Sequence, residues 1–175
     1  MEQAAATTPC PAMPRPAIPA SDSAALFGAY ADMVYRLAFL RTRSSSDAED
    51  VLQEVFLRVL RRRPLWNDAE HQKAWFLKVT VNCSKTLLTS AFRRQTVPET
   101  EDAALTMMEH DTDVYAAVLA LPEKYRTVVH LHYYEGYGVK EIAGVLRLPE
   151  NTVKSHLFRA RDMLREQLKG AYPDV

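Results

Sequence analysis

The sequence predicts an all-α protein of two small helical domains joined by a flexible linker, with a helix-turn-helix in the C-terminal domain. Three observations support this fold class. Apolar residues recur three and four positions apart through most of the chain, as on the buried face of a helix. No segment shows the alternation of apolar and polar residues that marks a half-buried strand. Residues 99–113 carry six acids, no Lys or Arg and no helical periodicity, which is typical of a linker.

The first domain, residues 22–94, is predicted to hold three helices. The first runs to about Arg43 with a buried stripe made of Leu26, Tyr30, Met33, Val34 and Leu37. The second begins at a capping box of Ser46 and Glu49 and ends at Pro64. Its predicted buried positions are Ala48, Val51, Leu52, Val55, Val59 and Leu60. The third, residues 71–92, should bury an apolar line formed by Trp75, Val79 and Cys83.

Beyond a linker at residues 95–112, the second domain, residues 113–171, is predicted to hold four helices. These are residues 114–121, 123–135, 139–146 and 150–168, with Pro122 and the pair Gly136 and Gly138 as breaks. Only three residues, 147–149, separate the last two helices, and the final helix is basic. Residues 147–169 carry six basic and three acidic side chains. A short helix, a tight turn and a longer basic helix form a helix-turn-helix pattern.

Composition limits the function classes. Lys and Arg number 22, as do Asp and Glu, so any nucleic-acid surface must be a local patch. Cys10 and Cys83 fit no zinc or redox spacing, and we interpret them as reduced thiols of a cytoplasmic protein. Residues 1–21 are predicted to be a disordered Pro/Ala-rich tail, and no apolar run reaches the ~18 residues of a membrane span.

The helix-turn-helix segment has an inner and an outer face. The predicted inner positions are Ile142, Ala143, Val145, Val153, Leu157, Ala160 and Leu164. The predicted outer positions are Asn151, Lys154, Ser155, Phe158, Arg159 and Asp162. Lys and Arg suit guanine, Asn suits adenine, and Ser suits either base. A charged helix that merely faces solvent is the alternative interpretation of this pattern.

Two sets of motifs resemble the extracytoplasmic-function sigma factors, the subunits that give bacterial RNA polymerase its promoter specificity. The second domain carries LPEKYR, EGYGVKEIA and TVKSHLFRAR, in that order. In the first domain, DAEDVLQEVFLRV is similar to the family's polymerase-docking helix and AWFLKVTVN to its minus 10 helix. The resemblance covers residues 22–170. It implies an alternative sigma factor that binds core RNA polymerase and promoter DNA, and it leaves an anti-sigma factor open as a further partner.

The same resemblance implies three groups of site residues. The polymerase-binding group is Asp50, Gln53 and Glu54. The minus 10 DNA-binding group is Trp75, Lys78, Asn82 and Lys85. The minus 35 DNA-binding group is Asn151, Thr152, Lys154, Ser155, His156, Phe158 and Arg159. The first group could instead be a solvated helix face. Trp75 fits a core position as well as a DNA contact.

The chain departs from the family pattern at four positions. Gly138 replaces a Ser at a helix start, a change worth only a few tenths of a kcal/mol. Arg147 replaces a turn Gly and is expected to adopt a left-handed conformation. Gly144 lies inside a helix, where it costs about 1 kcal/mol relative to Ala. His156 replaces an Arg and removes a fixed charge from the recognition helix.

Three other function classes remain to be weighed. A different helix-turn-helix regulator would not bind core polymerase, and a purely protein-binding adaptor would interact without salt sensitivity. An enzyme is not expected, because the sequence has no phosphate loop, HExxH motif, nucleophile elbow or catalytic carboxylate pair. His130 and His132 lie two positions apart, roughly 200° around a helix, so they cannot chelate a metal on one face. No cofactor or metal is expected.

Overall fold

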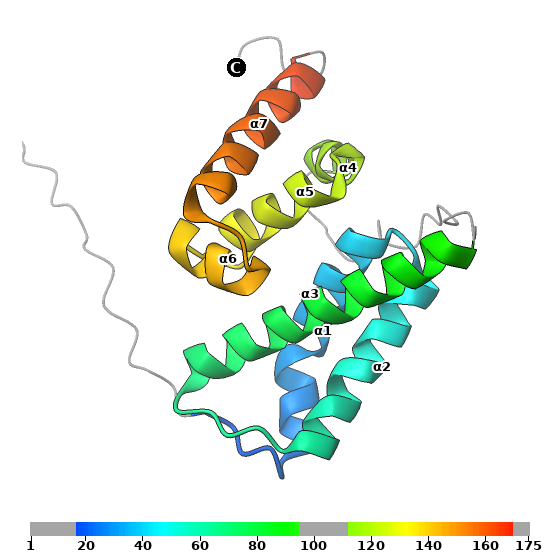
Figure 1. The fold of residues 1–175 in the computed structure, drawn as a ribbon, viewed down its shortest axis with the longest axis vertical. Helices are drawn as coiled ribbons and strands as arrows, with labels where there is room; N and C mark the ends of the chain where they lie inside the picture. Colours follow the sequence, from blue (N-terminus) through cyan, green and yellow to red (C-terminus); the bar gives the residue numbers. More distant parts are fainter. Residues whose placement is uncertain (1–16, 95–111, 170–175) are drawn as a thin grey trace, which may run out of the picture.

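The computed structural model describes residues 17–94 and 112–169. Within these ranges the regular elements are helices and no strand is present (Figure 1). The predicted linker, apart from Thr112, and residues 1–16 of the predicted tail lie outside the described residues, as does Cys10. The all-α fold class is confirmed.

Three helices form what we call the first unit: α1 (Ser23–Thr42), α2 (Ser45–Arg62) and α3 (Ala69–Arg94). Each packs on the other two. The cap of α2 differs from the prediction. Ser44, not Ser46, is the N-cap, and its hydroxyl accepts a hydrogen bond from Asp47 N at 3.2 Å. The extended backbone of Ser44 starts the helix earlier than the capping-box pattern indicated.

The core of the first unit confirms most of the predicted stripe of α2. Ala48, Val51, Val55 and Val59 are buried and Leu52 is half-buried, whereas Leu60 is 53% exposed. The prediction for Leu60 was therefore wrong: it lies one position, about 100° of rotation, beyond Val59. The side of α2 that packs on α1 and α3 is already occupied by the buried residues Val51, Val55 and Val59.

The buried line of α3 also differs from the prediction. Cys83 is buried as expected, but Trp75 and Val79 are only half-buried. The residues that α3 buries most deeply are Gln72, Phe76, Leu77, Thr80 and Ser84, and three of these five are polar. The hydroxyls of Thr80 and Ser84 donate to the carbonyl oxygens four residues earlier, both at 2.8 Å. Hydrogen bonds within the helix thus allow polar side chains to occupy its buried face.

Gln72 also binds a segment that we expected to be part of the tail. Its Oε1 accepts from Ile18 N at 3.1 Å, and its Nε2 donates to Ile18 O at 2.7 Å. The buried side-chain amide of Gln72 thus pairs with both the backbone N–H and the backbone C=O of Ile18, as a neighbouring strand would. The chain is therefore held against α3 from residue 18, five residues before α1 begins.

The second unit consists of α4 (Thr112–Ala120), α5 (Glu123–Val129), the π-helical turn η2 (His130–Tyr134), α6 (Val139–Leu146) and α7 (Glu150–Leu168). The turn η2 continues α5 directly. Glu141 Oε2 accepts a hydrogen bond from Gly138 N at 2.7 Å, which caps α6 without a serine. Arg147 has φ 55° and ψ 47°, the expected left-handed conformation. The predicted inner positions of α6 and α7 are buried, apart from the half-buried Leu164.

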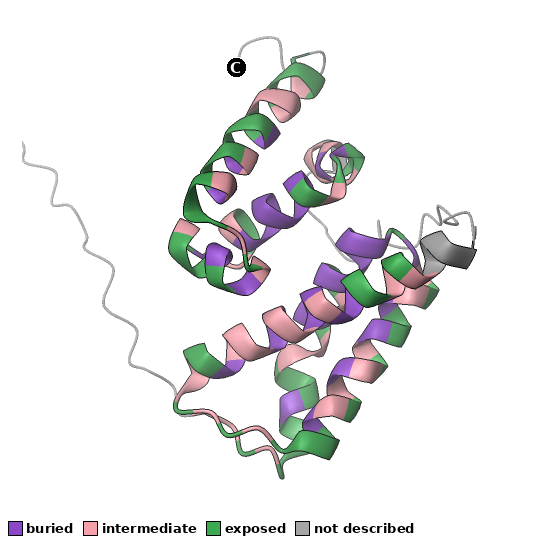
Figure 2. Ribbon diagram, viewed as in Figure 1, coloured by how far each residue is buried: buried purple, intermediate pink, exposed green. Residues whose placement is uncertain are grey.

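The two units pack against each other at the C-terminal end of α1. Residues 37–42 are all buried, so this end of the helix has no solvent-facing side (Figure 2). Leu40 belongs to the same apolar cluster as Val118, Leu121 and Val129 of the second unit. In addition, α1 contacts α5 and α3 contacts α6. The end of α1 is thus shared between the cores of both units.

Replacing Gly144 with Ala should raise the free energy of unfolding by about 1 kcal/mol, the helix-interior difference between the two residues. Gly144 is exposed, and no atom lies within 4 Å of the position of the added Cβ. Urea denaturation of both proteins measures the change. Gly136→Ala is the control: Gly136 has φ +74°, so the same substitution there should destabilise by about 1 kcal/mol. Stabilisation at both positions would contradict this explanation.

Candidate nucleic-acid interface

Helix α7, the second helix of the helix-turn-helix, presents most of the residues expected to face minus 35 DNA. Asn151, Lys154, Ser155, Phe158 and Arg159 are exposed, and Thr152 and His156 are half-buried. Phe158 is 63% exposed although it is a large apolar residue. An exposed apolar ring among donors is suited to the methyl group of thymine. The structure therefore brings donors and one apolar group together on the outer face of α7.

Tyr125 of α5 supports this face from beneath. Its ring meets the His156 ring edge-on, with 5.4 Å between centroids. A hydrogen bond from Arg159 lowers the pKa of the Tyr125 hydroxyl. Burial lowers the pKa of His156, and the nearby cations Lys124 and Arg159 lower it further, so the ring is neutral at pH 7. Sequence reasoning singled out the motif that contains Tyr125 but did not assign this residue a role.

The exposed face of α2 combines polar and apolar residues. Asp50 and Gln53 are exposed, and Glu54 is half-buried with its carboxylate 2.7 Å from Arg58 Nε. Leu57 and Leu60 are exposed by 41% and 53%. Positions 50, 53, 57 and 60 follow helical spacing, so they share one side of α2. Two exposed leucines on a charged face favour a protein-docking surface over a purely solvated one.

The four residues of α3 assigned to minus 10 DNA also share one side of their helix. Trp75, Lys78 and Asn82 are half-buried and Lys85 is exposed. The Trp75 ring packs edge-on against Trp66, with 5.7 Å between centroids. Trp75 thus lies at the edge of the first unit's core, and its contact with DNA stays a prediction. Trp66, which the sequence analysis did not consider, completes this aromatic cluster.

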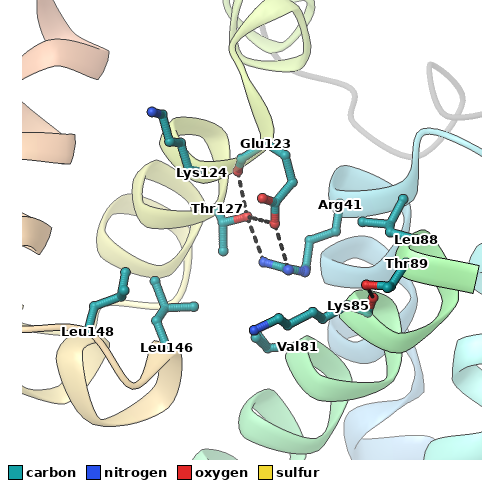
Figure 3. A pocket seen from close by; sticks show the side chains of 10 residues that line it. All are labelled: Arg41, Val81, Lys85, Leu88, Thr89, Glu123, Lys124, Thr127, Leu146 and Leu148. Atoms are coloured by element: carbon teal, nitrogen blue, oxygen red, sulfur yellow. Dashed lines mark hydrogen bonds and ion pairs between the residues drawn. The ribbon is translucent and has the colours of Figure 1, made fainter. Parts of the chain in front are cut away.

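An ion pair between the buried Arg41 and the half-buried Glu123 joins the two units (Figure 3). Arg41 Nη2 lies 2.6 Å from Glu123 Oε1, and Arg41 Nη1 donates to Thr127 Oγ1 at 3.0 Å. Arg126 of the second unit reaches the first unit in turn, and its Nη2 donates a hydrogen bond to Arg41 O at 2.9 Å. A cavity of about 340 Å³ adjoins these groups, lined from the first unit by Val81 and Lys85 among others and from the second by Leu146 and Leu148.

A second ion pair joins α3 to the end of η2. Lys73 Nζ lies 3.0 Å from Glu135 Oε2 and donates to Glu135 O at the same distance. It also lies 5.3 Å from the centre of the Tyr137 ring. Burial alone would raise the pKa of Glu135, but His130, whose Nε2 lies 3.4 Å from Glu135 Oε1, and the ion pair with Lys73 outweigh it and lower the pKa to about 2. Glu135 is therefore fully ionised at neutral pH.

Among the residues that the structure describes, no three His, Cys, Asp or Glu side chains form a group able to hold a metal ion. His130 is buried beside Glu135, whereas His132 Nδ1 lies 2.9 Å from Tyr137 O. None of the described helices has the length and apolar character needed to cross a membrane.

Comparisons with known proteins match both units separately. Residues 26–95 match the family model of Sigma-70 region 2, and residues 111–164 match that of Sigma-70 region 4. The RNA polymerase sigma factor SigV of Bacillus subtilis (strain 168) is 30% identical over 141 residues, 77% of this chain and 83% of that protein. The ECF RNA polymerase sigma factor SigL of Mycobacterium tuberculosis (strain ATCC 35801 / TMC 107 / Erdman) is 30% identical over 155 residues, 83% of this chain and 88% of that protein.

The fold also matches a solved structure. The sigma factor RpoE of Bartonella quintana, crystallised with the anti-sigma factor NepR, superposes with a TM-score of 0.71. The match covers 85% of this chain and 98% of that chain at 18% identity. At this identity the likeness establishes a shared fold.

Replacing Glu135 with Gln should lower the free energy of unfolding at pH 7 and have less effect at acid pH. The folded-state pKa of about 2 lies below the ordinary value of 4.5, so the carboxylate stabilises the fold fully above pH 4.5. That contribution is lost as the pH falls from 4.5 toward 2. Urea denaturation of wild type and variant at pH 7 and pH 3 measures it.

The control for this experiment is Glu166→Gln. Glu166 makes an exposed ion pair with Lys169, and such pairs contribute little to stability. Its replacement should change the free energy of unfolding only slightly at either pH. A difference between wild type and the Glu135 variant that is the same at pH 7 and pH 3 would count against the assigned charge state.

Proposed function

The chain belongs to the extracytoplasmic-function sigma factors of RNA polymerase, and we propose that its two units bind different parts of the polymerase and promoter complex. It binds core RNA polymerase and directs it to promoters, where transcription begins. The first unit, as part of a domain of residues 22–94, binds polymerase and the minus 10 element. The second, within residues 113–171, binds the minus 35 element, and residues 95–112 link the two.

Polymerase binding is assigned to the outer face of α2. Asp50, Gln53 and Glu54 supply polar contacts there, and the exposed Leu57 and Leu60 extend the surface with apolar area. Protein interfaces combine an apolar centre with a polar rim. This mixed face, in which leucines lie exposed at helical spacing with the polar residues, supports a docking role.

The outer face of α3 is assigned to the minus 10 element. Promoter opening exposes single-stranded bases, which aromatic rings bind by stacking and cations hold by their phosphates. Trp75, half-buried against Trp66, offers the ring, and Lys78 and Lys85 offer the cations. Asn82, which lies between them on the same side of the helix, can read a base edge.

Minus 35 recognition is assigned to α7, and the exposure of its donors is the observation that carries this assignment. Arg159 and Lys154 are exposed near the N-terminal half of the helix, the part that enters the major groove in a helix-turn-helix. His156, held against Tyr125, is expected to shape this face more than to contact bases. A neutral ring replaces the fixed charge that the family has there.

The place of action follows from the partners. Core polymerase and promoter DNA are in the bacterial cytoplasm, and we place the protein there. We assign it no catalytic reaction of its own, since polymerase performs the chemistry. The structural likeness to a sigma factor bound to an anti-sigma factor is consistent with regulation by such a partner.

Substitutions on α2 and α7 should separate the two binding functions. Gln53→Ala with Glu54→Ala should weaken binding to core polymerase while DNA binding persists, because both side chains lie outside the core. Arg159→Ala should cost about 1–3 kcal/mol of binding at a minus 35 site if the side chain pairs with a base. Polymerase binding should then persist.

Both measurements are made on the same proteins: pull-down with core polymerase, and titration of a duplex DNA selected by the wild-type chain from a random pool. Circular dichroism confirms that each variant is folded. Lys154→Ala serves as a comparison, since a phosphate contact weakens all sequences alike whereas a base contact relaxes preference at one position. Unchanged polymerase binding by the α2 variant, or unchanged DNA binding by the α7 variant, refutes the corresponding assignment.

A further inference from the structure

Tyr125 contacts three side chains at the edge of the outer face of α7. It lies in the first turn of α5, is 8% exposed, and belongs to the apolar cluster that includes Ala160 of α7. Its ring meets the ring of His156 edge-on at 85°, with 5.4 Å between the centroids. Lys124 Nζ lies 4.9 Å from the centre of the Tyr125 ring, and the Arg159 guanidinium donates a hydrogen bond to its hydroxyl. One buried side chain of α5 thus contacts two of the residues that we assign to minus 35 DNA.

The spacing of residues on α7 explains why one tyrosine reaches both of them. Positions 156, 159 and 160 are three and four residues apart, so their side chains are neighbours on the helix surface. The Tyr125 ring meets His156 and shares its apolar cluster with Ala160, which places the ring along the buried edge of this side. The hydroxyl at the end of the ring meets the side chain of Arg159, which is otherwise exposed. Arg159 is therefore held by the protein and open to solvent at once.

The neutral ring of His156 suits this arrangement. A cation at position 156 would repel the guanidinium of Arg159, three positions further along the helix. Burial and the nearby cations lower the pKa of His156 instead, so its ring carries no charge at pH 7. Its Nδ1 is buried and has no hydrogen-bond partner among the described residues. The ring of His156 therefore packs beside Tyr125 and leaves the hydroxyl open to a hydrogen bond from Arg159.

A hydrogen bond to Tyr125 does not prevent Arg159 from binding a base. A guanidinium group has five N–H donors, and the major-groove edge of guanine takes two of them at O6 and N7. An arginine that is already held in one orientation loses less conformational freedom when it binds. A mobile arginine can follow a phosphate or another base instead. The orientation of the guanidinium thus decides whether Arg159 acts as a general cation or as a selective one.

We propose that Tyr125 is a positioning residue for base recognition by α7. Its hydroxyl holds the Arg159 guanidinium in the orientation that binds one guanine, and its ring, packed against His156, fixes the place of the hydroxyl. Tyr125 acts through Arg159 and does not itself contact a base. This inference rests on the proposed function for the binding of minus 35 DNA, but the hold of Tyr125 on Arg159 in the free protein does not depend on it.

The first test uses the free full-length chain. Tyr125→Phe removes the hydroxyl and keeps the ring against His156. The matched control is Tyr137→Phe, which removes another buried hydroxyl of the second unit, one without a hydrogen-bond partner among the described residues. Nitrogen-15 NMR relaxation of the Arg159 Nε–H group, assigned by its loss in Arg159→Ala, measures the mobility of the guanidinium. This group should be ordered in the wild type and the control and mobile in Tyr125→Phe, and equal mobility in all three overturns the proposal.

The second test measures base preference by fluorescence anisotropy, on a duplex that the wild-type chain selects from a random pool. Each base pair is changed in turn, and the pair whose preference Arg159→Ala abolishes is the one that Arg159 binds. Tyr125→Phe should reduce the preference for guanine at this pair about three- to tenfold, as expected for the loss of one hydrogen bond. Preferences at the other pairs, and all those of Tyr137→Phe, should stay as in the wild type.

Two results of the second test overturn the proposal. One is an unchanged preference at the pair that Arg159 binds. The other is an equal loss of preference at every pair, which is the result expected if Tyr125 only supports the fold of α7. In the Arg159→Ala background, adding Tyr125→Phe should cause no further loss, because the hydroxyl acts through Arg159. Circular dichroism confirms that each variant keeps its helices.

The positioning role and the proposed function fail in different measurements. A wild-type chain that selects no duplex, or an Arg159→Ala variant with unchanged preference at every pair, refutes the assignment of α7 to minus 35 DNA and the binding of guanine with it. The relaxation comparison on the free chain stands apart from that result. A preference that depends on Arg159 but not on the Tyr125 hydroxyl refutes the positioning role alone.

Discussion

The buried end of α1 is the constraint on which the arrangement of the two units depends. Six consecutive residues, 37–42, are buried there, so the helix needs packing partners on every side. Helices α2 and α3 cover part of it, and α5 covers the rest. Arg41 could not be buried at this point without Glu123 and Thr127, because an unpaired buried cation costs several kcal/mol. Packing and electrostatics thus require the same contact.

This contact pairs two of the chain's cations with its own carboxylates. The chain is neutral as a whole, but the binding to two separate DNA elements that we propose needs cations at each of them. On α7 the cations are exposed and ready to bind, whereas on α1 and α3 two of them are bound by the chain's own carboxylates. A neutral chain can therefore carry exposed cations on one helix and cations paired with its own carboxylates at the contact between its units.

Local patterns allowed the sequence to predict the helices, the helix-turn-helix and the inner face of α7. Apolar spacing identifies a buried face when the buried residues are apolar, as with Val153, Leu157 and Ala160. The same rule failed on α3, where the buried line includes Gln72, Thr80 and Ser84, whose polarity is satisfied by hydrogen bonds that no pattern reveals.

The candidate sites were predictable to a similar degree. Helical spacing placed Gln53, Lys154 and Arg159 on outer faces, and the structure agrees. The roles of Tyr125, Arg41 and Glu135 depend on contacts between distant segments, which a single sequence does not encode locally. One signal was available: the run Leu-Ala-Phe-Leu at 37–40 has no polar side, which indicates a helix end buried all round.

The central claim is that this chain gives RNA polymerase its choice of start site. Transcription in vitro with purified core polymerase on a library of bacterial genomic DNA, followed by sequencing of the transcript ends, tests it most directly. We expect start sites that depend on the added chain and share one sequence element near minus 10 and another near minus 35. The same start sites with core polymerase alone, or none with the chain present, would contradict the claim.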